Sequence, residues 1–96
     1  MISGEDYKTL WSAKMSLDAW GQALSSFGTN EQRIAAGYCR DLMRWCQATV
    51  RGREARYALA QMVNRSGLMK TDTGELQAAV DGLSSEINTL LPAYCC

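Results

Sequence analysis

Two runs of apolar residues, spaced alternately three and four positions apart, constrain the fold of this chain more than any other feature. The first run is Leu10, Ala13, Leu17, Trp20, Leu24 and Phe27, and the second is Leu76, Val80, Leu83, Ile87 and Leu90. At about 100° per residue such steps keep to one side of an α-helix. The chain holds one proline, and no stretch alternates apolar and polar residues as a strand would. The sequence therefore predicts an all-α protein.

The predicted helices cover about 4–27, 30–64 and 72–91, followed by a short tail at 92–96. Ser3 with Asp6 fits a helix start, Thr29 with Gln32 fits another, and Ser66-Gly67 fits a stop. Pro92 ends the last helix because it cannot donate its own amide. We expect these helices to form one antiparallel bundle spanning 1–96.

The central helix changes register at Gly52. Before it, the apolar side is predicted to be Ile34, Tyr38, Leu42, Trp45 and Thr49, flanked by Cys39, Cys46 and Val50. After it, Leu59, Met62 and Val63 would lie roughly 100° away from that side if the helix ran straight. Either the helix breaks at Gly52, which gives four helices, or its second half packs against a different neighbour.

The core of so small a bundle is thin, and thin cores are often completed by association of subunits. We therefore expect a homo-oligomer. Glycines stand within helical stretches at Gly21, Gly37, Gly52 and Gly82. Each disfavours a helix by about 1 kcal/mol against alanine, so some are expected to permit close approach of neighbouring helices.

Charge is segregated along a chain whose formal net charge is zero. Residues 29–70 hold eight bases and three acids, whereas residues 71–96 hold four acids and no base. Within the basic part, Arg33, Arg40, Arg44 and Arg51 follow each other at seven, four and seven positions, so they fall on one helix face. Small residues, Gly37 among them, stand beside this arginine stripe and leave room for a partner.

Three interpretations of the arginine stripe stay open. Arginine presents a planar fork of donors that suits carboxylates and phosphates, so the stripe fits an acidic protein surface or a nucleotide or nucleic acid. Alternatively, the arginines are solvated or pair with Asp81, Glu86 and their neighbours. Single-strand recognition is disfavoured because Tyr38 and Trp45 are predicted to lie opposite the stripe, where bases could not stack. Duplex recognition is disfavoured because the sequence shows no helix-turn-helix, zinc-finger or basic-zipper pattern.

A second place for a small anion is the predicted start of the last helix. Free amides there would be joined by nearby basic and hydroxyl side chains. The residues concerned are Arg65, Lys70, Thr71 and Thr73.

Catalysis and metal binding are disfavoured. The chain contains no histidine, no glycine-rich phosphate loop and no recognised spacing of metal ligands. Cys39 and Cys46 are expected to be small buried side chains, and the absence of a secretory pattern points to reduced thiols in the cytoplasm. No window is apolar enough for a membrane span. We expect no catalytic residues, no metal and no cofactor.

In size and helical character the chain resembles compact phage counter-defence proteins, anti-CRISPR proteins among them, although no shared motif carries the resemblance. That resemblance implies an intracellular inhibitor of a host defence complex, docking through the arginine stripe. The first alternative is an oligomeric module that sequesters a nucleotide messenger between arginines and aromatics. The second is a structural or assembly protein.

Overall fold

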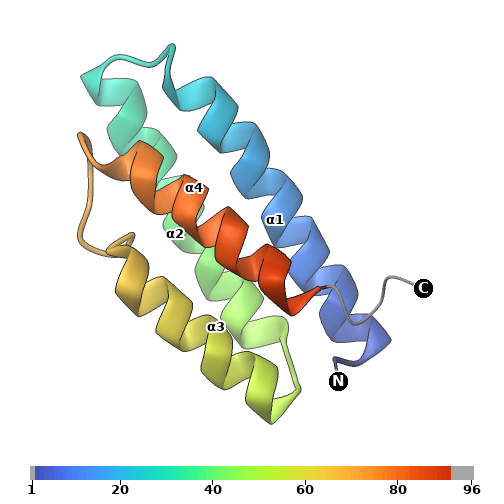
Figure 1. The fold of residues 1–96 in the computed structure, drawn as a ribbon. Coiled ribbons are helices and arrows are strands. Elements are labelled where there is room, and N and C mark those ends of the chain that lie inside the picture. The colour runs from blue at the N-terminus through green and yellow to red at the C-terminus, as the bar shows by residue number, and fades with distance from the viewer. Residues whose placement is uncertain (1, 92–96) are drawn as a thin grey trace.

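A computed structural model describes residues 2–91 of the protein, and this part of the chain forms four helices. They are α1 (Gly4–Leu24), α2 (Thr29–Thr49), α3 (Arg53–Ser66) and α4 (Leu76–Leu90). Successive helices run in opposite directions, and α4 lies along α1 and α3 (Figure 1). The all-α prediction is confirmed, in its four-helix form. The predicted tail at 92–96, with Pro92, Cys95 and Cys96, lies outside the described residues.

The helix boundaries differ from the predicted ones at three places. Helix α1 ends at Leu24 rather than near Phe27, and Gly28 becomes the residue that precedes α2. Its amide donates to Glu31 Oε1 at 3.3 Å, so Glu31, not Gln32, is the capping partner. Helix α4 starts at Leu76 rather than near 72, because the preceding residues form an irregular connection. The predicted start at Ser3 is confirmed, since its hydroxyl accepts from Asp6 N.

The predicted helix over 30–64 is interrupted at Gly52, and a carboxylate of α1 explains the break. Asp6 is almost fully buried, and its two oxygens accept from Arg51 N at 2.9 Å and Gly52 N at 2.7 Å. These bonds replace the helical partners that the two amides would otherwise need. A Cβ on Gly52 would lie 2.8 Å from Asp6 Oδ2, so no larger residue fits without displacing this bond pair.

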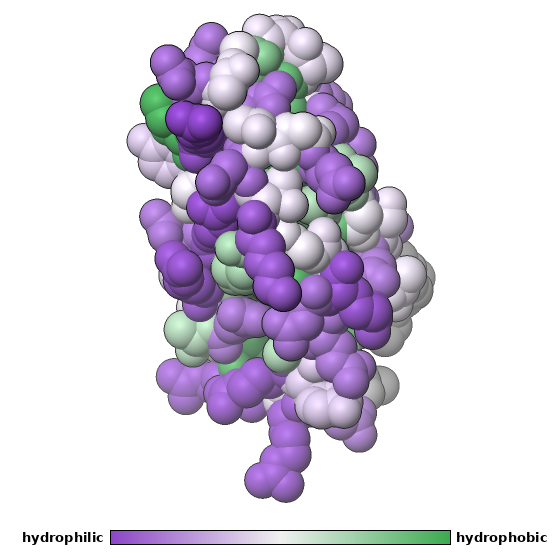
Figure 2. All heavy atoms as spheres, turned by 90° about the vertical axis from the view of Figure 1, so that its left-hand side faces the viewer, coloured by the Kyte–Doolittle hydropathy of each residue, from purple (hydrophilic) through white to green (hydrophobic). Residues whose placement is uncertain are grey.

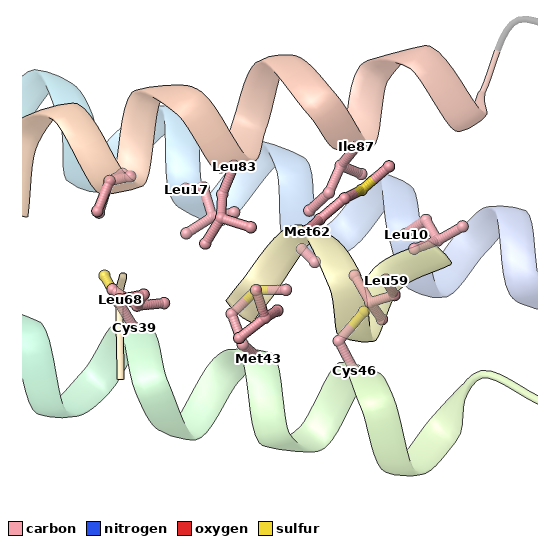
Figure 3. Close-up of a cluster of buried hydrophobic side chains, with 14 of the residues drawn as sticks. Leu10, Leu17, Cys39, Met43, Cys46, Leu59, Met62, Leu68, Leu83 and Ile87 are labelled. Atoms are coloured by element: carbon pink, nitrogen blue, oxygen red, sulfur yellow. The ribbon is translucent and has the colours of Figure 1, made fainter. Parts of the chain in front are cut away.

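The hydrophobic core lies where all four helices meet (Figure 3). Leu10 and Leu17 of α1 face Leu83 and Ile87 of α4, as the two seams predict. Helix α3 adds side chains from below this layer, and the segment after it adds one more. These are Leu59, Met62, Val63 and Leu68.

The buried side of α2 is not the predicted one. Its buried residues are Ala35, Ala36, Cys39, Met43 and Cys46. The predicted apolar side contains Ile34, Tyr38 and Trp45, which are 60%, 57% and 46% exposed. The predicted flank of Cys39, Cys46 and Val50 is buried, whereas the bulkier side chains of the predicted apolar side face outward.

One of the interior glycines does permit close helix packing. The carbonyl of Gly21 on α1 accepts from Gln77 Nε2 of α4 at 2.8 Å, and a Cβ on Gly21 would lie 2.6 Å from Asp81 Oδ1. By contrast, a Cβ on Gly37 or Gly82 would meet nothing within 4 Å. The bundle itself therefore does not require glycine at those two positions.

Candidate functional site: the outer face of α2

Helix α2 turns two different edges away from the core. We call Arg33 and Arg44, together with Arg51 just beyond the end of the helix, the basic edge, and we call Ile34, Tyr38 and Trp45 the apolar edge. Both consist of exposed residues. At about 100° per residue the two edges lie roughly 100° apart around the helix axis. Figure 2 views the side formed by α2, α3 and the connection to α4, where hydrophilic side chains predominate and pale or green ones stand between them.

Arg40, the fourth member of the arginine stripe, is engaged inside the molecule. Its guanidinium donates to the carbonyl oxygens of Leu68 at 3.2 Å and of Thr71, and it pairs with Asp72 Oδ1 at 2.6 Å. Only 19% of its side chain is exposed. Arg40 thus fastens the connection between α3 and α4 to α2.

The three arginines of the basic edge are not bound within the molecule as Arg40 is. Arg44 Nη1 lies 3.2 Å from Asp41 Oδ1, but both side chains are well exposed and such pairs contribute little. Within residues 2–91 the side chains of Arg33 and Arg51 make no hydrogen bond or ion pair. Arg33 is near enough to help Arg40 hold the pKa of Asp72 below its ordinary value, with Arg40 the larger cause. The basic edge is therefore open to an external anion.

The acidic last part of the chain is satisfied elsewhere. Glu86 pairs with Arg65 at 3.2 Å, and Asp81 accepts from Gln77 on its own helix. Asp72 takes Arg40. Of the alternative in which the acidic last part of the chain neutralises the arginine stripe, the single chain shows one case, Arg40 with Asp72; Asp81 and Glu86 pair elsewhere.

The apolar edge is the feature that sequence reasoning placed on the wrong side of α2. Tyr38 stacks on Trp20 of α1 with ring centroids 5.7 Å apart and planes 14° apart, which fixes its ring while leaving it accessible. Trp45 and Ile34 project beside it along the same helix. The sequence does contain a second apolar row on α2 that could have revealed the buried side. It consists of Ala35, Ala36, Cys39, Met43 and Cys46, which are mostly small side chains.

Small residues separate the two edges. Gly37 and Ala48 stand between the basic and apolar edges, together with Asp41. Because a side chain on Gly37 would meet no atom of the bundle, its smallness matters only to what approaches from outside. A partner can therefore come close to the backbone of α2 here.

The second predicted anion site is placed differently by the fold. Arg65 lines a hollow of about 590 Å³ beside α4, but Glu75 and Glu86 line it too. Thr71 gives its carbonyl oxygen to Arg40, and Thr73 and Lys70 precede α4 by several residues rather than standing at its first turn. Two carboxylates at this hollow oppose the binding of an anion.

The two cysteines of α2 are buried free thiols, as expected. Burial raises the pKa of Cys39 to about 11 and that of Cys46 to about 12, since a thiolate is poorly solvated in an apolar core. Among residues 2–91 no cluster of cysteines and carboxylates could hold a metal ion.

Both buried thiols are expected to resist alkylation in the folded protein. At pH 8 iodoacetamide should modify Cys39 and Cys46 at least about 100-fold more slowly than in 6 M guanidinium, because reaction requires opening of the fold. Peptide mass spectrometry after a time course measures this at each cysteine. Equal rates with and without denaturant would contradict the burial of α2's inner face.

No protein-family model, curated protein or solved structure matches the chain. None of the four helices in residues 2–91 combines the length and apolar content of a membrane span.

Proposed function

We propose that the protein acts by binding another protein rather than by catalysis, with the basic edge of α2 docked on an acidic surface. The observation that carries this proposal is the contrast within one stripe. Arg40 is committed to the connection between α3 and α4, whereas Arg33, Arg44 and Arg51 face outward without a strong internal partner. Arginines held on a rigid helix suit bidentate contacts with carboxylates.

A protein surface fits this edge better than a nucleic acid. Asp41 stands next to Arg44 and would repel a phosphate backbone, while a protein can offer it a donor. The chain's formal net charge of zero also gives little long-range attraction to a polyanion. The form of binding that we propose, by resemblance to phage counter-defence proteins, is occlusion of an acidic site on a host complex in the cytoplasm.

The test is affinity capture with a matched charge control. We expect Arg33→Glu/Arg44→Glu to retain at least about 10-fold less partner than wild type, because each change turns a contact into a repulsion. The control, Lys8→Glu/Arg53→Glu, makes the same change of charge at exposed positions of α1 and α3 and should bind as wild type does. Immobilised proteins would be exposed to bacterial lysate and the bound proteins quantified by mass spectrometry, with circular dichroism confirming unchanged helicity.

Two outcomes would contradict the proposal. One is an identical set of retained proteins for wild type and Arg33→Glu/Arg44→Glu. The other is heat of binding on titration with nucleotides that the arginine variant abolishes, which would replace the acidic protein by a nucleotide messenger.

A further inference from the structure

The apolar edge of α2 stays about half exposed, although one face of Tyr38 stacks on Trp20 of α1 and the spacing of the edge is that of a packed helix. Ile34, Tyr38 and Trp45 account for three of the six large hydrophobic side chains exposed among the described residues. With Asp41 they form a row at 34, 38, 41 and 45, with steps of four, three and four. These positions stay within roughly 60° of one direction, the width of a helix-pairing seam.

From this row we infer that the apolar edge is covered by the same edge of a second copy of the chain, with the two α2 helices antiparallel. The spacing four, three, four reads the same in both directions, so a twofold axis can pass between Tyr38 and Asp41. It then places Ile34 opposite Trp45 of the second copy, and Tyr38 opposite Asp41 of the second copy. Every contact occurs twice, as in an isologous dimer.

Charge selects this register among the symmetric alternatives. Centring the axis on Asp41 would set two carboxylates against each other, which is repulsive. Centring it between Tyr38 and Asp41 instead lets the tyrosine hydroxyl donate to the carboxylate of the second copy. Arg44 lies 3.2 Å from Asp41 in its own chain.

The size of the surface indicates a dimer of moderate affinity. Ile34, Tyr38 and Trp45 together expose on the order of 300 Å² per chain, about half of what a standard interface of roughly 800 Å² per partner buries. The neighbouring Gly37, Asp41 and Ala48 add to this area, but the total stays below the standard size. We therefore expect a weak dimer, with a dissociation constant on the order of 10–100 μM.

The dimer leaves the proposed docking surface accessible and enlarges it. In an antiparallel helix pair, the same flanking side of each helix lies on the same side of the contact between them. The basic edges of both copies therefore come to one side of the dimer interface. The inferred dimer is independent of the proposed function, because the dimer forms through the apolar edge and the proposed partner binds the basic edge.

A charge reversal with rescue tests the dimer and its register together. Sedimentation equilibrium from about 1 to 300 μM should give a dimer for wild type. Tyr38→Asp should raise the dissociation constant about 30-fold or more, because it removes a central aromatic and opposes Asp41 of the second copy. Tyr38→Asp/Asp41→Lys should restore most of the association, since each new carboxylate then faces a lysine.

The control is Trp11→Ser, which removes an equally exposed aromatic from α1 outside the row. It should leave the dissociation constant unchanged. A monomeric wild type at 300 μM, a dimer insensitive to Tyr38→Asp, or loss of the dimer in Trp11→Ser would each overturn the inference. If Tyr38→Asp/Asp41→Lys does not regain association, the proposed pairing of Tyr38 with Asp41 of the second copy is wrong. The variant Arg33→Glu/Arg44→Glu, tested in the same way, separates failure of the dimer from failure of partner docking.

Discussion

Asp6→Ala is expected to lower the free energy of unfolding by about 3 kcal/mol, the combined loss of two hydrogen bonds from a charged acceptor. The carboxylate accepts from Arg51 N and Gly52 N, and without it both amides at the start of α3 lose their partner. For a domain of this size the midpoint of thermal unfolding should fall by roughly 15 °C. Urea and thermal unfolding followed by circular dichroism would measure both quantities.

The control for this change is Glu5→Ala, which removes an exposed carboxylate from the same turn of α1. Glu5→Ala should lower the free energy of unfolding by at most about 1 kcal/mol, the usual contribution of an anion near a helix N-terminus. If the two variants unfold at the same midpoint, the bond pair of Asp6 is not what stabilises the break at Gly52.

Arg40→Ala is expected to lower the free energy of unfolding by about 2–3 kcal/mol, because it leaves the carbonyl oxygens of Leu68 and Thr71 without their charged donor. Arg44→Ala, on the same stripe, should cost less than about 0.5 kcal/mol since its pair with Asp41 is exposed. Hydrogen exchange should localise the effect of Arg40→Ala to residues 67–75. Equal costs for the two variants would contradict the distinction between Arg40 and the basic edge.

The contact of Arg40 with Asp72 also has a pH signature. Arg40 holds the pKa of Asp72 below its ordinary value of 3.8, chiefly through their hydrogen bond. The contribution of the pair is therefore complete above about pH 4 and is lost as the pH falls through the lowered pKa. In the same unfolding experiments, Asp72→Asn should accordingly be less stable than wild type at pH 7, and the difference should shrink as the pH falls through the lowered pKa of Asp72.

Sequence periodicity predicted α1 and α4 well because their buried residues, such as Leu17 and Leu83, are both apolar and large. It failed for α2 because Tyr38 and Trp45 outweigh alanine and cysteine in any hydrophobic pattern. The buried positions of α2 are taken instead by Ala35, Ala36, Cys39, Met43 and Cys46, most of which are small. The direction of α2 could not be read from its own residues alone.

The candidate site was likewise predicted in part. The spacing of the arginine stripe predicted one face for four arginines, but only Arg33, Arg40 and Arg44 lie on α2, and Arg51 follows the end of the helix. The change of register correctly marked Gly52 as a place for a break. The different role of Arg40 depends on its contact with Asp72, 32 residues later in the chain. The break at Gly52 depends on Asp6, 46 residues earlier. Such partners are set by tertiary contacts.

The bond pair between Asp6 and the start of α3 ties the junction of two helices to a third. An excised segment covering 29–66 would lack the carboxylate, so the amides of Arg51 and Gly52 would lose their acceptor. Its bend would keep the local contact in which the guanidinium of Arg56 donates to the carbonyl oxygen of Val50. The junction between α2 and α3 is therefore fastened from two directions, once by its own residues and once by a residue near the N-terminus.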